Sequence, residues 1–185
     1  YGAPYVQDFE GDLRYSTLKD FIYFLKQVES LKEFKINGGI LCQPNDCPSE
    51  CVTLLMWYAI LRGSEKVLFC PAGSEKETKA MMEMGAAVFG GKENFSRSAK
   101  SVYLVDSISP LQMDPRTVDV IRVLAEYRQP FSFTSGVITG LTGPVTLAGS
   151  IALGNAEILS GIALAHHRRT FLRCCTGLWC TLCFS

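Results

Sequence analysis

The chain has 185 residues, of which 48% are hydrophobic and 19% are charged, a composition typical of a soluble globular domain with a substantial core. Its 18 basic residues balance its 18 acidic residues. No net charge therefore attracts nucleic acid or anionic lipid, and we expect neither nucleic acid nor a membrane as a partner.

The first residue is Tyr1 and no secretory signal pattern is visible. We expect an internal fragment of a longer protein.

The eight cysteines are unevenly placed, because four of them crowd into residues 174–183. A secreted disulfide scaffold would spread its cysteines along a short, loop-rich chain, so this placement predicts a reducing, cytoplasmic location. A zinc site is the alternative interpretation of the cysteines. Its ligands would be Cys42, Cys47 and Cys51, or the cysteines of residues 174–183. Structural zinc sites use regular cysteine or histidine pairs, and only Cys180 and Cys183 have a suitable spacing. We favour buried or incidental cysteines and expect no metal.

Helical and strand-like patterns alternate along the chain in order. Ser16 or Thr17 caps the first predicted helix, and Asp114 with Pro115 begins the fourth. Gly38 and Gly39 indicate a close approach of the backbone to a neighbouring group. The predicted helices cover residues 17–30, 51–61, 75–89, 114–127 and 144–165, and the predicted strands cover residues 35–42, 66–70, 101–106 and 130–134.

Strands separated by helices indicate βα units and a parallel sheet, so the predicted fold class is α/β. Four strands are placed, and a fifth is expected before Tyr5 or beyond the end. Both a doubly wound sheet and an incomplete barrel agree with this alternation, and periodicity leaves the choice open. No G-x-G-x-x-G motif follows a strand, so no dinucleotide site is indicated.

The apolar segment of residues 145–165 has the length of a membrane span, which is one interpretation. Asn155 and Glu157 lie near its centre, where a charge is costly in lipid. We therefore expect a buried helix of a soluble protein instead. Three small residues would let it pack tightly against a sheet: Gly149, Gly154 and Gly161.

Several stretches, in matching order and spacing over residues 1–165, resemble the trimethylamine methyltransferase family. The most specific is GPVTLAG at residues 143–149, continued by NAEILSGI at residues 155–162. The others are YGAPYVQDFEG at residues 1–11, QPNDCP at residues 43–48, VFGG at residues 88–91 and SISPL at residues 107–111.

The resemblance implies a TIM-type (β/α) barrel, of which residues 1–165 would supply a part. It also implies transfer of a methyl group from trimethylamine, or from a quaternary amine such as glycine betaine, to a corrinoid protein. The corrinoid (cobalamin) is carried by that partner and not bound directly by this chain. The full-length protein is expected to form a homo-oligomer. Some family members carry pyrrolysine in a later part of the protein, which this chain does not contain.

The sequence departs from the family pattern at three places and in its tail. Asp106 stands where Asn is usual, residues 141–143 read Leu-Thr-Gly in place of Ala-Thr-Ala, and Gly154 replaces Gln. Residues 166–185 form an atypical Cys- and Arg-rich tail. A frameshift is our hypothesis for this tail, because codons for residues 174–178 read in another phase can encode Leu-Tyr-Gly-Ser, which resembles the family's continuation.

Reacting groups of a βα barrel lie at the C-terminal ends of its strands and in the loops that follow. This rule selects Cys42, Cys70 and Ser135, together with the residues that we predict to bind substrate. A fully methylated ammonium cannot donate a hydrogen bond, so its pocket needs aromatic faces and a carboxylate. Tyr103 has a suitable ring as well. The predicted substrate-binding residues are Asp106, Ser107, Phe133, Thr134 and Gln43.

Each of these assignments has a structural alternative. For Phe133 and Tyr103 we favour core packing over a role in the site, and for Asp106 we favour capping of the loop after its strand. No catalytic residue is assigned, because the corrinoid supplies the nucleophile and the enzyme orients the substrate and excludes water. A second functional hypothesis is a non-catalytic binding or scaffold half-domain, whose exposed sheet edge and apolar flank would associate with another polypeptide.

Overall fold

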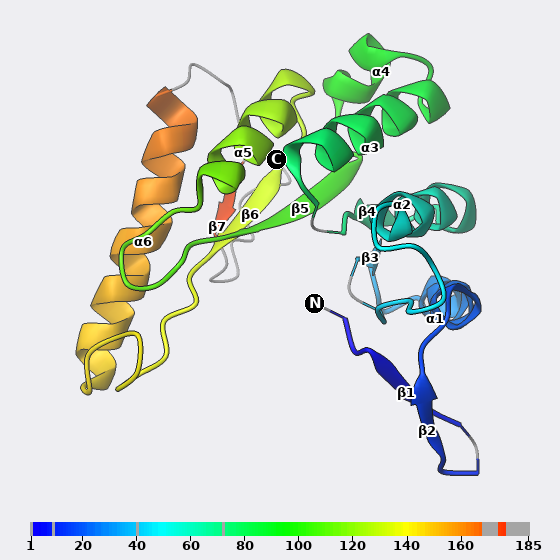
Figure 1. The fold of residues 1–185 in the computed structure, drawn as a ribbon. Coiled ribbons are helices and arrows are strands. Elements are labelled where there is room, and N and C mark those ends of the chain that lie inside the picture. Colours follow the sequence, from blue (N-terminus) through cyan, green and yellow to red (C-terminus); the bar gives the residue numbers. More distant parts are fainter. Residues whose placement is uncertain (1, 9, 40, 72, 168–173, 177–185) are drawn as a thin grey trace. The chain divides into compact units, whose positions relative to one another are not determined.

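The computed structural model describes residues 2–8, 10–39, 41–71, 73–167 and 174–176 (Figure 1). The chain divides into two compact units, Tyr1–Phe95 and Ser96–Ser185. Each unit contains parallel strands that alternate with helices. The predicted α/β class is therefore confirmed. The described strands do not close into a barrel, so the TIM-type barrel stays a prediction.

The first unit begins with an antiparallel hairpin that the sequence analysis did not predict. Strands β1 (Tyr5–Gln7) and β2 (Leu13–Tyr15) pair with Tyr5 opposite Tyr15. The two tyrosine rings stack with their centroids 4.8 Å apart. Both strands are largely exposed, so the hairpin is held by its backbone ladder and by this aromatic pair.

Helices and short parallel strands alternate through the rest of the first unit. Helix α1 (Leu18–Ser30) begins with the predicted cap at Thr17, whose hydroxyl accepts from the backbone of Asp20. Strands β3 (Ile36–Gly38) and β4 (Val67–Phe69) pair in parallel. The remaining helices are α2 (Val52–Gly63), α3 (Glu75–Val88) and the short α4 (Lys92–Arg97), which was not predicted.

The core of the first unit lies between its helices and the sheet. Trp57 is fully buried and donates its indole N–H to the carbonyl of Met81 at 2.8 Å. Gly39 has a φ of +72°, and a Cβ there would lie 1.8 Å from the Phe69 ring. The predicted close approach of the backbone is thus confirmed at this glycine. The other large buried side chains of this core are Phe21, Leu25, Ile60, Met81, Met82 and Phe95.

The second unit contains three parallel strands in the order β5 (Ser101–Asp106), β6 (Phe131–Thr134) and β7 (Cys174–Thr176). Helix α5 (Pro115–Glu126) connects β5 to β6, and helix α6 (Leu147–His167) connects β6 to β7. Asp114 caps α5 as predicted, by accepting from the backbone of Arg116.

The register of β5 and β6 separates two faces of this sheet. Tyr103 pairs with Phe131, and Asp106 pairs with Thr134. Successive side chains of a strand point to opposite faces of the sheet, and paired residues of neighbouring strands lie on the same face. The buried face carries Tyr103, Val105, Phe131 and Phe133, and the other face carries Leu104, Asp106, Ser132 and Thr134.

Helix α6 departs from the prediction in its burial. One helix, over Leu147–Ala165, is long and apolar enough to cross a membrane by length and composition, yet only 17% of that stretch is buried. The predicted buried helix is therefore exposed over most of its length within the described part of the chain. The reason is that only one stripe of α6, including Glu157, Gly161 and Ala165, faces the protein, while Leu147, Ile151 and Leu159 stay exposed.

Strand β7 lies within the segment that we predicted to be an atypical tail. Its residues 174–176 continue the sheet by pairing in parallel with β6. Residues 168–173 and 177–185 lie outside the described residues. The frameshift hypothesis concerns the DNA sequence and stays a prediction. The boundary at residue 165 stays a prediction.

Candidate functional site

The predicted site residues Asp106 and Thr134 are brought together at the C-terminal ends of two neighbouring strands. They are the last residues of β5 and β6 and lie opposite each other in the register. The Thr134 hydroxyl donates to a carboxylate oxygen of Asp106. Asp106 is exposed and Thr134 is half-buried. The pair therefore presents one oriented carboxylate on the sheet face opposite the core.

A second carboxylate, which the sequence analysis did not assign, lies next to this pair. Glu157 of α6 is 1% exposed and accepts four hydrogen bonds. Three of them reach its Oε2 atom, from the hydroxyls of Ser107 and Ser135 at 2.6 Å and of Ser109 at 2.8 Å. The fourth comes from the backbone N–H of Leu111 to Oε1 at 2.8 Å.

These hydrogen bonds determine the charge of Glu157. Burial by itself would raise the pKa of this carboxyl group, but the bonds from the hydroxyls and the backbone N–H outweigh burial and lower the pKa from 4.5 to about 2. The group is therefore ionised at neutral pH. Four donors already occupy its oxygens, so Glu157 is poorly suited to act as a general base and well suited to hold its neighbours in place.

Helix α6 contains a signal from which Glu157 could have been found. The helix carries no other Asp, Glu, Lys or Arg residue. A single carboxylate in such an apolar helix must either face solvent or be matched by donors, because an unsatisfied buried charge is very costly. In the sequence, Glu157 argued against a membrane span and formed part of the NAEILSGI stretch, but no role in the site was assigned to it. Its donors lie 22 to 50 positions away along the chain, where local patterns do not reveal them.

The two aromatic candidates point away from the Asp106–Thr134 pair. Phe133 is 0% exposed and Tyr103 is 2% exposed, both on the buried face of the sheet. A Cβ at Gly161 of α6 would lie 2.5 Å from Phe133 Cε2, so the ring packs directly on the helix backbone. The structure agrees with the core-packing alternative for both rings. It gives Phe133 no exposed face with which to contact a cation.

Ser107 and Gln43 complete the predicted set. Ser107 is 8% exposed, and its hydroxyl donates to the Glu157 carboxylate. It is therefore not available to contact a substrate. Gln43 belongs to the first unit and follows β3. Its backbone N–H donates to the carbonyl of Ala3 at 3.0 Å, and its carbonyl accepts from the Ser16 hydroxyl and from Asn45 Nδ2. A role for Gln43 in substrate binding stays a prediction.

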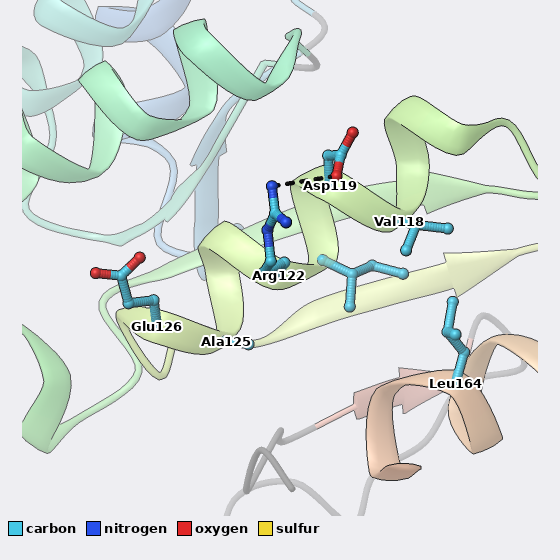
Figure 2. A pocket seen from close by; sticks show the side chains of 7 residues that line it. Val118, Asp119, Arg122, Ala125, Glu126 and Leu164 are labelled. Carbon is cyan, nitrogen blue, oxygen red and sulfur yellow. Dashed lines mark ion pairs between the residues drawn. The ribbon is translucent and has the colours of Figure 1, made fainter. Parts of the chain in front are cut away.

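Three hollows of the described residues are lined by residues other than the predicted substrate-binding residues, although one of them includes Ser16 and Asn45, which hydrogen-bond to Gln43. In the second unit, a cavity of about 390 Å³ lies between α5 and α6, with Leu164 contributed by α6 and the other lining residues by α5 (Figure 2). In the first unit, an apolar groove of about 360 Å³ runs between α1 and α2, and a hollow of about 460 Å³ is lined by residues that include Asn45 and Asp46. The second-unit cavity is lined by Val118, Asp119, Ile121, Arg122, Ala125, Glu126 and Leu164.

No group of three or more His, Cys, Asp or Glu residues that could hold a metal ion occurs within the described ranges. Four cysteines within them are free thiols: Cys42, Cys47, Cys51 and Cys70. The terminal cysteine group that the zinc interpretation also used lies largely outside these ranges. Metal analysis of the purified protein would test the zinc interpretation, and stoichiometric zinc would support it.

We expect Cys42 to be alkylated more slowly than Cys47 and Cys51, which are both more exposed. It is 1% exposed, and burial together with the nearby Asp20 carboxylate raises its pKa to about 11. At pH 8 its thiolate fraction is about 100-fold lower than for a thiol with a pKa near 9. Iodoacetamide labelling followed by peptide mass spectrometry measures the rate, with the urea-unfolded protein as reference. Labelling of Cys42 at the unfolded rate would contradict this placement.

The fold is α/β with parallel strands, and the candidate site lies at strand ends and carries two carboxylates and several hydroxyls. The family described as "Trimethylamine methyltransferase (MTTB)" matches residues 1–181. The chain therefore belongs to the trimethylamine methyltransferase family, as the resemblance predicted. The match continues past residue 165 into the predicted tail.

The chain is similar to several methyltransferases of known name. It is 34% identical over 165 residues to the glycine betaine methyltransferase of Desulfitobacterium hafniense (strain Y51), which covers 89% of this chain and 34% of that protein. It is 26% identical over 175 residues to the L-carnitine:corrinoid methyltransferase of Eubacterium limosum, with 89% of this chain and 35% of that protein covered.

A shorter match links the chain to an archaeal relative. The trimethylamine methyltransferase MttB of Methanosarcina barkeri (strain Fusaro / DSM 804) is 38% identical over 81 residues, which cover 43% of this chain and 16% of that protein. The matches to the betaine and carnitine methyltransferases cover 89% of this chain. The chain spans about a third of the length of each of these two relatives.

Proposed function

We propose that the full-length protein transfers a methyl group from a methylated ammonium compound to a corrinoid carried by a partner protein. The names of the relatives, which include betaine, carnitine and trimethylamine methyltransferases, support this proposal. The structural observation that carries it is the exposed Asp106 carboxylate, held by Thr134 at the C-terminal ends of two parallel strands. Strand ends of this kind are where βα enzymes bind their substrates.

The chemistry of the substrate explains why a carboxylate is useful there. A quaternary ammonium carries a permanent positive charge and has no N–H with which to form a hydrogen bond. Attraction to a carboxylate at about 4 Å is worth about 1 kcal/mol in bulk water and about 4 kcal/mol near a protein surface. Asp106 thus contributes to holding the cation, and Thr134 fixes the direction of the carboxylate by its hydrogen bond.

The residues of this chain orient the substrate and do not form a covalent bond with it. In the transfer, the C–N bond breaks with its electron pair left on nitrogen, and the reduced corrinoid supplies the pair for the new bond to carbon. The described strand ends offer carboxylate and hydroxyl oxygens, which suit an ammonium better than cobalt. We therefore assign the corrinoid to the partner protein. The same proposal includes a cytoplasmic location and a homo-oligomeric full-length protein.

The proposal is tested with the full-length protein and its corrinoid protein in the reduced state. Glycine betaine, trimethylamine and L-carnitine are supplied in turn, and the demethylated amine is measured by mass spectrometry. We expect glycine betaine to react, because the relative of that name shares 34% identity over 89% of this chain. No demethylated product from any of the three amines would contradict the proposal.

We expect Asp106→Asn to lower kcat/KM for the amine about 10- to 100-fold, because the variant removes the charge and keeps the shape of the side chain. Asp119→Asn is the matched control, since Asp119 lies on α5 in a surface ion pair with Arg122. The control should change kcat/KM less than about twofold. Equal effects of the two variants would show that Asp106 does not contact the substrate.

An interaction module is the second candidate function, and the exposure of α6 favours it. Apolar residues such as Leu147 and Ile151 are 71% and 61% exposed, and such faces mark surfaces for association. Under this alternative, a full-length protein with an intact fold would transfer no methyl group and would still associate with another polypeptide. Size-exclusion chromatography beside the transfer assay separates the two functions.

A further inference from the structure

Glu157 joins three segments that the chain keeps far apart in sequence. It lies on α6, it accepts from Ser107, Ser109 and Leu111 in the loop after β5, and it accepts from Ser135 directly after β6. Hydrogen bonds to an ionised acceptor are roughly twice as strong as neutral ones. A buried carboxylate with four such bonds therefore holds both loops in one arrangement.

The loop after β5 depends on this carboxylate in a further way. Leu111 has a φ of +51°, a left-handed conformation that is uncommon for a residue with a side chain. Its side chain is 68% exposed and gains little from packing. Its backbone N–H donates to Glu157 Oε1 at 2.8 Å, and this charge-assisted bond offsets the cost of the conformation.

The bonds of Glu157 reach the residues that face the substrate. Ser107 directly follows Asp106, and Ser135 directly follows Thr134. The backbone N–H of Ser107 also donates to the carbonyl of Thr134 at 3.0 Å. A shift of either serine would therefore move the carboxylate–hydroxyl pair on the opposite face of the sheet, and with it the place where the substrate ammonium is held.

We propose that Glu157 is a positioning residue, which acts through Ser107 and Ser135 to place Asp106 and Thr134 for a tetraalkylammonium group. The inference rests on the proposed function, because it names the support of the same site. Glu157 does not contact the substrate. Its carboxylate stays ionised and saturated, and its contribution is the fixed spacing between two strand ends.

The first test uses Glu157→Gln in the full-length protein, with tetramethylammonium as the probe. The amide keeps the shape of the side chain but replaces one acceptor oxygen with a donor. We expect the Kd of tetramethylammonium, measured by calorimetry, to rise about tenfold, which corresponds to about 1.4 kcal/mol. KM for the amine should rise by a similar factor while kcat changes less than about threefold, because ground-state placement is what the variant disturbs.

Hydrogen exchange shows whether the effect arises in the loop. The amide of Leu111 should exchange about tenfold faster in Glu157→Gln than in the wild-type protein, because a neutral amide oxygen is a weaker acceptor for its N–H than the carboxylate oxygen. The amides of β5 should keep their protection, which shows that the sheet is intact. A loss of protection throughout the second unit would instead identify general unfolding, and the weaker variant below would then decide.

Ser109→Ala is that weaker variant, because it removes one of the four donors and leaves the carboxylate in place. We expect it to raise the Kd of tetramethylammonium about two- to fivefold. Ser160→Ala is the matched control on the same helix. The Ser160 hydroxyl donates to the backbone carbonyl of Glu157 at 2.7 Å and does not touch its carboxylate, so this variant should bind the probe as the wild-type protein does.

The outcomes separate this inference from the proposed function. Wild-type protein that binds tetramethylammonium, together with unchanged Kd in Glu157→Gln and Ser109→Ala, would overturn the positioning role alone. Wild-type protein that neither binds the probe nor demethylates any amine would overturn both. Increased Kd in both variants, with faster exchange at Leu111 and an unaffected Ser160→Ala control, supports the role.

Discussion

Gly161→Ala is expected to destabilise the protein by about 2 kcal/mol, within a range of roughly 1–3 kcal/mol for overpacked cores. A Cβ at this position would lie 2.5 Å from Cε2 and 2.6 Å from both Cδ2 and Cζ of Phe133. The Phe133 ring is 0% exposed, so it has no free space into which to move. Either α6 must shift away from β6 or the ring must leave its position.

The same helix supplies the control, Gly154→Ala. A Cβ at Gly154 would lie 3.4 Å from Ser135 Oγ and 3.8 Å from its Cβ, which are ordinary van der Waals distances. Replacing a helical glycine with alanine then stabilises the protein by roughly 0.5–1 kcal/mol. Urea unfolding followed by circular dichroism measures both variants. Equal changes in the free energy of unfolding would contradict the close packing of Phe133 on α6.

Many elements of the fold could be predicted because their signals are local. Thr17 and Asp114 cap helices within three residues of themselves, and Ser101–Asp106 alternates in burial along its whole length. The β1–β2 hairpin lacked such a signal, since its three-residue strands are mostly exposed and bury no apolar face. Helix α4 has only six residues and one buried side chain, Phe95, which is too short for a period to be visible.

The candidate site shows where the same reasoning stopped. Asp106 and Thr134 were identified because parallel strands end at the same edge of a sheet. Phe133 precedes Thr134 directly, so the alternation of side chains places it on the other face. That exclusion was available from the sequence once β6 was placed. The role of Glu157 could not be predicted from the sequence. That role depends on contacts between α6 and two loops, and the tertiary fold determines these contacts.

Stability at acid pH is expected to depend strongly on Glu157. Its pKa is lowered from 4.5 to about 2 in the folded protein, so folding favours the ionised form. The carboxylate therefore contributes its full stabilisation above its unfolded-state pKa near 4.5, which amounts to about 3 kcal/mol. As the pH falls from about 4.5 towards about 2, the unfolded chain gains a proton that the folded protein does not, and the contribution decreases.

Comparison with Glu157→Gln isolates this effect from that of other acids whose pKa is lowered on folding, such as Asp20 and Glu29. The free energy of unfolding is measured by urea titration of both proteins at pH 7, 5, 4 and 3. Because glutamine does not titrate, the difference between wild type and variant should be largest near neutral pH. It should shrink by about 2 kcal/mol at pH 3, where most of the carboxylate contribution is lost. A difference that stays constant over this range would mean that Glu157 has the same pKa in the folded and unfolded chain. The three serine hydroxyls and the Leu111 N–H would then not stabilise its ionised form.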